Sequence, residues 1–163
     1  MVSILFLCHG NICRSPMGEF IMKDLVRREG LEKDFEISSA AVSDEEIGNP
    51  VYPPARKKLS EYGISVKGHA AHRVTSKEFD AADYVIVMDR YNLDWLEEIV
   101  GRDKMEDRSK VHMMMEFVSI PPVPRETADN VADPWFTGDF ETTFQDIVGG
   151  CRGLLKMLVR KCS

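Results

Sequence analysis

The chain places a cysteine and an arginine around a short loop near its start. Residues 4–16 read ILFLCHGNICRSP, so Cys8 follows an apolar run and Arg14 stands just before an expected helix. A loop between a strand and a helix N-terminus directs backbone N–H groups and partial positive charge toward one point, which suits an anion. A guanidinium can grip two phosphate oxygens, and the same positive field favours a thiolate over a thiol. The spacing therefore predicts a nucleophilic thiolate inside a phosphate-binding loop.

The residues inside this loop strengthen that interpretation. Gly10 and Asn11 are residue types that tolerate the left-handed backbone of a tight loop. The spacing of cysteine and arginine is a weak signal by itself, and Cys8 could instead be a small buried core residue. The preceding apolar run and the Ser15-Pro16 pair, which is typical of a helix start, favour the phosphate-binding loop.

Strand and helix patterns alternate along the rest of the chain. Short apolar runs predict buried strands at 2–7, 35–40 and 83–89, and a fourth strand could lie at 110–117. Apolar residues at helical spacing predict helices at 15–30, 53–63, 91–100 and 139–161. Ser15 is the expected N-cap of the first helix and Gly30 its stop. A polar, proline-rich loop is expected at 120–138, and glycines weaken the middle of the last helix.

This order predicts an α/β fold: a doubly wound, mostly parallel four-stranded sheet flanked by helices, with the phosphate-binding loop after strand 1. Ligands of such sheets bind beyond the carboxyl ends of the strands, which is where Cys8 would lie. A chain of 163 residues fits one domain, 1–163.

Composition narrows the function classes. The formal charge of -6 opposes nonspecific attraction to nucleic acid, and no apolar run is long enough to cross a membrane. The first residues read as a strand and not as a signal peptide, so a cytoplasmic protein is expected. Neither a disulfide framework nor a paired-cysteine zinc site fits the four cysteines, and we expect reduced thiols, no metal and no cofactor. These cysteines are Cys8, Cys13, Cys151 and Cys162.

Two longer motifs carry a family resemblance. The stretch FLCHGNICRSPMGE resembles the signature of the low-molecular-weight protein tyrosine phosphatases, and DPWFTGDFETTF at 133–144 resembles their second motif, particularly in bacterial members. Between them ISSAAVSD, LSEYGI, GHAAHRV and DYVIVMDRYNL occur in the order found in that family. The resemblance therefore covers essentially the whole chain.

The resemblance implies roles for the loop residues. Cys8 would attack phosphorus to form a phosphocysteine, while Arg14 and the loop amides hold the phosphoryl oxygens. Ser15 would hydrogen-bond the Cys8 sulfur and so stabilise it as a leaving group. Ser39 and His69 would hold Asn11 in a hydrogen-bond network. The implied phosphate-binding loop consists of His9, Gly10, Asn11, Ile12, Cys13 and Ser15.

A proton donor for the leaving oxygen is also needed, and the same carboxylate can later activate water. By sequence alone the Asp-Pro pair at Asp133 is typical of a turn. The resemblance selects Asp133 over Asp129 and Asp139, and implies that Trp135 and Phe136 form aromatic walls of the substrate cleft. The expected substrates are phosphotyrosine proteins and aryl phosphates. The expected ligands are phosphate, vanadate or sulfate.

Departures from the family pattern concern the rim of the cleft and not its chemistry. The loop after the second strand is acidic, SDEEIG with Glu45 and Glu46, and YPPAR replaces the usual Asp-Pro-Arg. Related protein-arginine phosphatases carry threonine at the position of Ile12, so Ile12 favours phosphotyrosine. An arsenate reductase needs two further cysteines, which are missing between Cys13 and Cys151. A non-catalytic phosphate-binding module would need neither a nucleophile nor a proton donor.

Cys13 has no role in hydrolysis. It could be a small buried residue, but the resemblance places it in the same loop as Cys8. We hypothesise that peroxide oxidises Cys8 and that Cys13 then forms a reversible disulfide with it.

Overall fold

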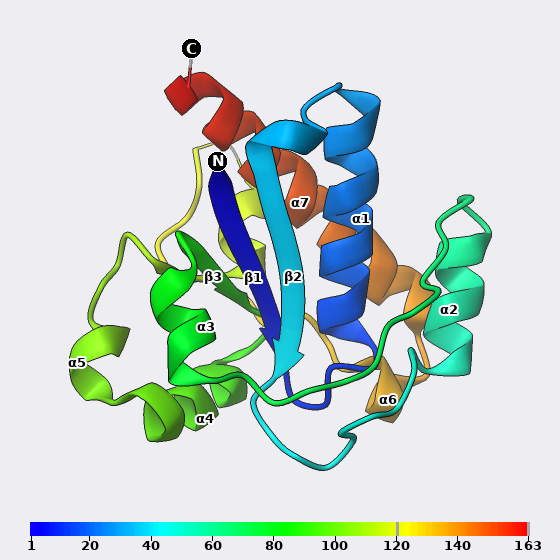
Figure 1. Ribbon diagram of the computed structural model, residues 1–163, viewed down its shortest axis with the longest axis horizontal. Coiled ribbons are helices and arrows are strands. Elements are labelled where there is room, and N and C mark those ends of the chain that lie inside the picture. The colour runs from blue at the N-terminus through cyan, green and yellow to red at the C-terminus, as the bar shows by residue number, and fades with distance from the viewer. Residues whose placement is uncertain (120, 163) are drawn as a thin grey trace.

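The computed structural model describes residues 1–119 and 121–162. Its sheet has four strands, all parallel, in the order β2-β1-β3-β4. The strands are β1 (Val2–Cys8), β2 (Phe35–Ala41), β3 (Tyr84–Val87) and β4 (Val111–Met113). The doubly wound sheet expected from the sequence is confirmed, and in the described residues it is parallel throughout (Figure 1).

Both faces of β1 are buried, which explains its nearly continuous apolar run. Ile4 and Phe6 point into one core, and Leu5 and Leu7 point into the other. On the first face lie α1 (Arg14–Arg28), α2 (Pro53–Ser60) and α7 (Phe140–Cys162). On the second lie α3 (Ser76–Ala81), α4 (Arg90–Val100) and α5 (Arg102–Met105), and Figure 1 shows the two groups on opposite sides of the strands. The sheet thus lies between two layers of helices.

The start of α1 differs from the expectation. The helix begins at Arg14, and its N-cap is Cys13 with no side-chain cap hydrogen bond, so the prediction of Ser15 as the N-cap was wrong. The physical reason is that Ser15 is the second residue of the helix, and both its N–H and its hydroxyl contact Cys8. The first N–H groups of α1 are therefore directed into the loop and not capped by a side chain. Gly30, with a φ of 70°, follows the end of the helix as predicted.

The fourth strand is shorter than the predicted range 110–117. After Met113 the chain turns into a 3-10 helix, η2 (Met114–Val118), which packs against α7. A Cβ on Gly150 would lie 2.6 Å from Met114 Cε, and one on Gly153 would overlap the carbonyl oxygen of Phe117. The glycines that weakened the sequence-based prediction of α7 are what allow η2 to approach an unbroken helix.

Several short helices were missed by sequence analysis. α3 begins with a capping box in which Thr75 and Glu78 bond each other's backbone, a pattern that TSKE encodes. α5 and the 3-10 turn η1 (Glu32–Asp34) are single turns without a strong pattern. The proline-rich stretch expected as a loop contains α6 (Pro134–Thr137), whose N-cap is Asp133.

Candidate active site

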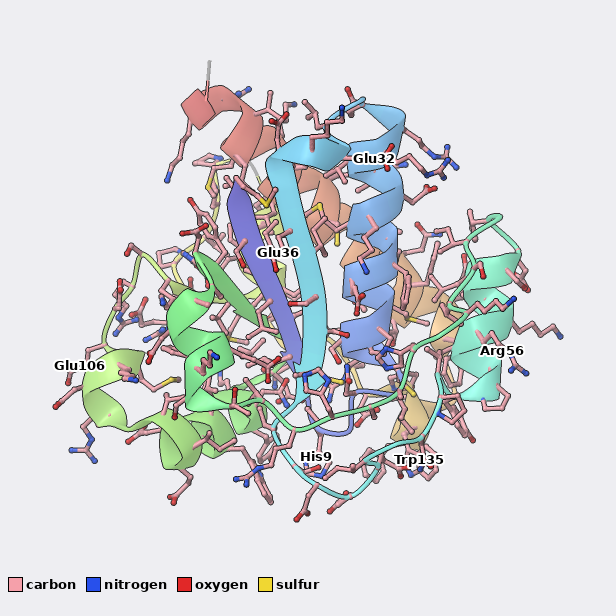
Figure 2. The ribbon with its side chains drawn as sticks, in the orientation of Figure 1. His9, Glu32, Glu36, Arg56, Glu106 and Trp135 are labelled. Carbon is pink, nitrogen blue, oxygen red and sulfur yellow. The ribbon has the colours of Figure 1, made fainter. Side chains whose placement is uncertain are left out.

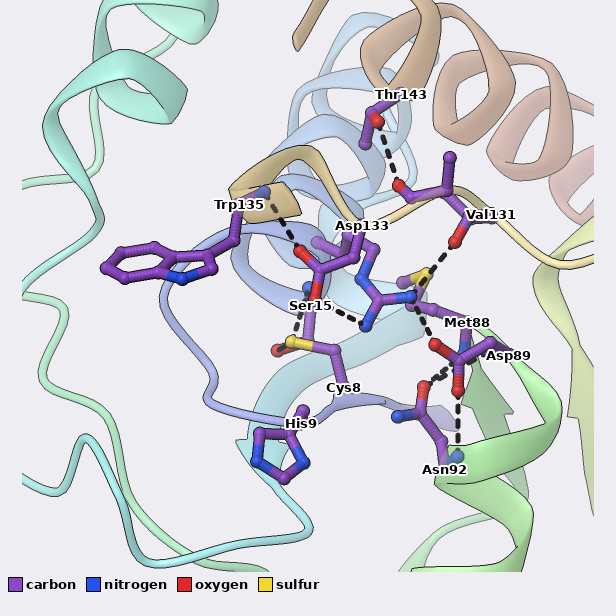
Figure 3. Close-up of polar contacts among 12 residues, drawn as sticks. Cys8, His9, Ser15, Met88, Asp89, Asn92, Val131, Asp133, Trp135 and Thr143 are labelled. Atoms are coloured by element: carbon purple, nitrogen blue, oxygen red, sulfur yellow. Dashed lines mark hydrogen bonds and ion pairs between the residues drawn. The ribbon is translucent and has the colours of Figure 1, made fainter. Parts of the chain in front are cut away.

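Cys8 is the last residue of β1, at the carboxyl edge of the sheet, where the loop leads into α1. Its Sγ donates to Ser15 Oγ at 3.1 Å and accepts from the Ser15 N–H at 3.3 Å (Figure 3). A hydroxyl can rotate, so Ser15 can equally donate to a thiolate in this position. The sulfur therefore sits at the N-terminus of α1 with two groups able to stabilise its negative charge.

Asn11 shapes the loop. Among the described residues it alone, apart from glycines, has a positive φ, 61°, and it is fully buried. Its Nδ2 donates to Ser15 Oγ at 2.8 Å and to Ser39 Oγ at 3.0 Å. His69 Nε2 lies 2.8 Å from the Asn11 carbonyl oxygen. The structure thus brings Ser39 and His69 to Asn11 as predicted, and these bonds compensate the left-handed backbone.

Glu19 extends this network and was missed by sequence analysis. The residue is 8% exposed, and its Oε1 accepts from Ser39 Oγ at 2.5 Å. Its other oxygen is 2.5 Å from Lys23 Nζ. A glutamate one turn into a helix looks like a solvated residue, and only the proximity of β2 reveals its contact with Ser39.

Arg14 is almost completely buried and is held by two carboxylates. Its Nη1 donates to Asp89 Oδ2 at 2.6 Å and to the Val131 carbonyl at 3.0 Å, and its Nη2 reaches Asp133 Oδ2 at 3.4 Å. Burial alone would lower the pKa of Arg14, but Cys8 and the two carboxylates outweigh burial and raise it. The guanidinium therefore stays charged, and these contacts fix its orientation. Figure 3 shows Asp89, Val131 and Asp133, the three residues that hold it, close to Cys8.

Asp89 is the second residue that sequence analysis missed. It follows β3 and caps α4, where its Oδ1 accepts from the Asn92 N–H at 2.8 Å. Fixed in this way, it presents its other oxygen to Arg14. Its position after a buried strand, at the carboxyl edge of a parallel sheet, was the available signal.

The structure distinguishes the three aspartates considered as proton donors by their position relative to the pocket. Asp133 lines the pocket above Cys8, and its Oδ1 accepts from the Trp135 N–H at 3.1 Å. Asp139 instead bonds the N–H and hydroxyl of Thr142 at the start of α7, which lowers the pKa of Asp139. Asp129 is exposed and does not line the pocket. The geometry favours Asp133.

The pocket has a volume of about 260 Å³. Its floor is the loop, represented by Cys8, His9, Gly10, Ile12, Cys13 and Arg14. Its walls are Glu45, Glu46, Asp133, Trp135 and Phe136. Tyr52 packs against Trp135 with ring centroids 4.8 Å apart, which supports that wall of the pocket.

The described part of the chain offers neither a cluster of metal ligands nor a membrane-spanning helix. No group of three or more His, Cys, Asp or Glu there is placed to hold a metal ion. No helix there is long and apolar enough to cross a membrane.

Comparison with known proteins agrees with this geometry. The model of a family described as low molecular weight phosphotyrosine protein phosphatase matches residues 3–163. The low molecular weight protein-tyrosine-phosphatase YfkJ of Bacillus subtilis is 37% identical over 161 residues, 99% of this chain and 98% of that protein. The human low molecular weight phosphotyrosine protein phosphatase is 32% identical over 156 residues, 94% of each chain. The chain belongs to the low molecular weight phosphotyrosine protein phosphatase family.

Solved structures of two other proteins share the fold. The crystal structure of YfkJ from Bacillus subtilis matches with a TM-score of 0.89 and 36% identity, covering 100% of this chain and 98% of that one. The crystal structure of DARP, a Drosophila arginine phosphatase, matches with a TM-score of 0.80 and 26% identity, covering 95% and 96%. The resemblance inferred from the motifs is thus confirmed.

Proposed function

We propose that the protein is a protein-tyrosine phosphatase that acts through a phosphocysteine intermediate, with residues 1–163 as one catalytic domain. The observation that carries the proposal is the meeting of Cys8, Arg14 and Asp133 in one pocket at the N-terminus of α1. A nucleophile, an anion clamp and a proton donor are the three parts that phosphomonoester hydrolysis requires.

In the first step the Cys8 thiolate attacks phosphorus and forms an S–P bond while the bond to the tyrosine oxygen breaks. Protonated Asp133 gives its proton to that oxygen, which leaves as tyrosine. In the second step Asp133, now a carboxylate, takes a proton from water. The resulting oxygen nucleophile attacks phosphorus, the S–P bond breaks, and the thiolate returns with Ser15 as its hydrogen-bond partner.

Arg14 is arranged to bind the phosphoryl group without losing its support. Its Nη1 is fixed by Asp89 and the Val131 carbonyl, whereas the Nη2 contact to Asp133 is long, at 3.4 Å. A phosphoryl oxygen can take the place of this long contact and free Asp133 for proton transfer. The loop amides and Arg14 supply the positive field that other phosphatases obtain from metal ions.

The substrate proposal follows from the pocket walls. Trp135 and Phe136 are exposed and flank the entrance, as expected for walls that receive an aryl phosphate. Phosphate, vanadate and sulfate are the small anions that fit the loop.

The thiols support a proposal on cellular location. Cys8, Cys13 and Cys151 are free thiols, as in proteins of a reducing, cytoplasmic compartment.

Hydrolysis of phosphoarginine is the second candidate, because a protein named as an arginine phosphatase shares the fold. The bulky side chain of Ile12 forms part of the pocket floor, which supports phosphotyrosine instead.

The deciding experiment assays the purified protein with para-nitrophenyl phosphate, a phosphotyrosine peptide, a matched phosphoarginine peptide, and arsenate with thioredoxin, each with and without EDTA. We expect turnover of the first two at rates that EDTA leaves unchanged. Preference for phosphoarginine would select the second candidate. A loss of activity with EDTA, restored by Mg²⁺ or Zn²⁺, would contradict the mechanism.

A further inference from the structure

Two glutamates stand at the entrance of the pocket, on the segment that follows β2. Glu45 Oε2 is 2.8 Å from His9 Nε2, and Glu46 Oε2 accepts from Asn49 Nδ2 at 2.6 Å. Both glutamates line the pocket. His9 and Asn49 therefore fix the orientation of the two carboxylates at the mouth of the pocket.

The charges at the mouth and in the depth of the pocket are opposite. Among the described residues that line the pocket, Arg14 is the only lysine or arginine, and its side chain is 3% exposed. It can meet a phosphoryl group but not the residues beside it in a peptide. His9 is the other basic side chain there, and it is engaged by Glu45. A substrate thus meets carboxylates at the rim and positive charge only below them.

An aromatic surface continues the rim beyond His9. Trp95 of α4 lies edge-on to the His9 ring, with centroids 5.2 Å apart, and remains 45% exposed. An exposed indole face attracts the cations of lysine and arginine. His9 and Trp135 lie at the same end of the molecule in Figure 2, so the carboxylates and Trp95 border the entrance that a phosphorylated segment must cross.

We propose that this rim selects phosphotyrosine segments with lysine or arginine next to the phosphotyrosine and disfavours acidic ones. The inference rests on the proposed function, since it names the substrate class of the same site. Glu45 and Glu46 attract the flanking cations, and Trp95 adds a face on which one of them can lie.

The expected size is modest because the rim is exposed to solvent. Exposed ion pairs contribute about 0.2–1 kcal/mol each, so two flanking lysines change kcat/KM by about two- to thirtyfold relative to two glutamines. Screening makes the preference fall as salt concentration rises. Two flanking glutamates should lower kcat/KM relative to two glutamines, because the carboxylates at the rim repel them.

The test uses three phosphotyrosine peptides that are identical except for lysine, glutamine or glutamate on both sides of the phosphotyrosine. The readout is the ratio of kcat/KM for the lysine and glutamate peptides within one variant, so a common change in rate cancels. The test variant is Glu45→Gln with Glu46→Gln. The matched control is Glu32→Gln with Glu36→Gln, which removes the same charge from exposed residues at the opposite end of β2 (Figure 2).

We expect a ratio well above one in the wild type and the control, and a ratio that falls most of the way toward one in the test variant, where only Trp95 remains, and at high salt. A ratio near one in the wild type, with all peptides hydrolysed, overturns the inference and leaves the proposed function standing. A high ratio that survives in the test variant also overturns it, because the selection would then lie elsewhere. If no peptide is hydrolysed, the proposed function itself fails and this inference with it.

Discussion

The loop that carries Cys8 and the segment that carries Asp133 reach the same pocket but are built differently. Asn11 and Ser15 in the loop are buried and bonded to each other, and Asn11 also bonds β2. In the other segment, Trp135 and Phe136 are 53% and 84% exposed. The half that we propose binds the phosphoryl group is thus fixed by the core, while the half that we propose meets the leaving group is exposed to solvent.

Replacing the nucleophile tests the buried half most severely. Cys8→Ser should lower turnover of para-nitrophenyl phosphate by more than about four orders of magnitude, because a serine hydroxyl is a far weaker nucleophile here. Binding of phosphate or vanadate, measured by calorimetry, should largely survive, since Arg14 and the loop amides remain. Arg14→Ala is the contrast and should weaken both binding and turnover. Residual turnover close to that of the wild type in Cys8→Ser would exclude the phosphocysteine mechanism.

The exposed half should respond in a way that depends on the leaving group. Asp133→Asn should lower kcat by roughly two to four orders of magnitude for poor leaving groups, the usual contribution of a general acid. The loss should shrink along a series of aryl phosphates as the leaving group improves, because a good leaving group needs no proton. Equal losses across the series would place the acid elsewhere, with Asp129 and Asp139 as the next residues to replace.

The loop geometry can be disturbed without removing a reacting group. Asn11→Ala loses the bonds to Ser15 and Ser39 and must hold an alanine at a φ of 61°, so unfolding free energy should fall by about 2–4 kcal/mol. A misplaced loop should also lower kcat, by up to about 10²-fold. Asn11→Gly loses the same bonds but accepts the backbone, and should recover about 1 kcal/mol in urea unfolding. Equal stability of the two variants would show that strain at this position is unimportant.

The fold was predictable where a local pattern was strong. β1 and α1 follow from an apolar run, a Gly-Asn loop and helical spacing that all agree. β4 was predicted too long because a run of methionines packs equally well in a strand or in the 3-10 helix that follows it. The capping box at Thr75 could have revealed α3, whereas α5 has only four residues and little pattern to recognise.

The site residues follow the same rule as the secondary structure. Those that are adjacent in the sequence were predictable, and those that meet only in the folded chain were not. The loop residues were predictable because they are contiguous and their chemistry is explicit. Asp89 was not, because its contact with Arg14 joins residues 75 positions apart in the sequence. Glu19 was missed because a charged residue on a helix usually faces water, and here β2 covers it.

The smallest effect on turnover is expected at Cys13, which the mechanism does not use. Burial, reinforced by Cys8, raises the pKa of the Cys13 thiol well above its usual value, so Cys13 itself should resist peroxide. Peroxide should convert the Cys8 thiolate to a sulfenic acid, and Cys13 should then attack that sulfur, forming a disulfide and releasing water. Both cysteines line the same pocket, although the loop must distort for their sulfurs to bond.

Replacing Cys13 therefore gives a redox test of the loop that carries Cys8. Cys13→Ser should remain active but stay inactive after a peroxide dose from which the wild type recovers with added thiol, because its sulfenic acid proceeds to irreversible sulfinic acid. Bound phosphate should slow inactivation of both proteins, since it occupies the loop and shields Cys8. The measurement is the activity regained with dithiothreitol, with mass spectrometry to detect a Cys8–Cys13 disulfide. Equal recovery of the two proteins would mean that Cys13 only fills space beneath the loop.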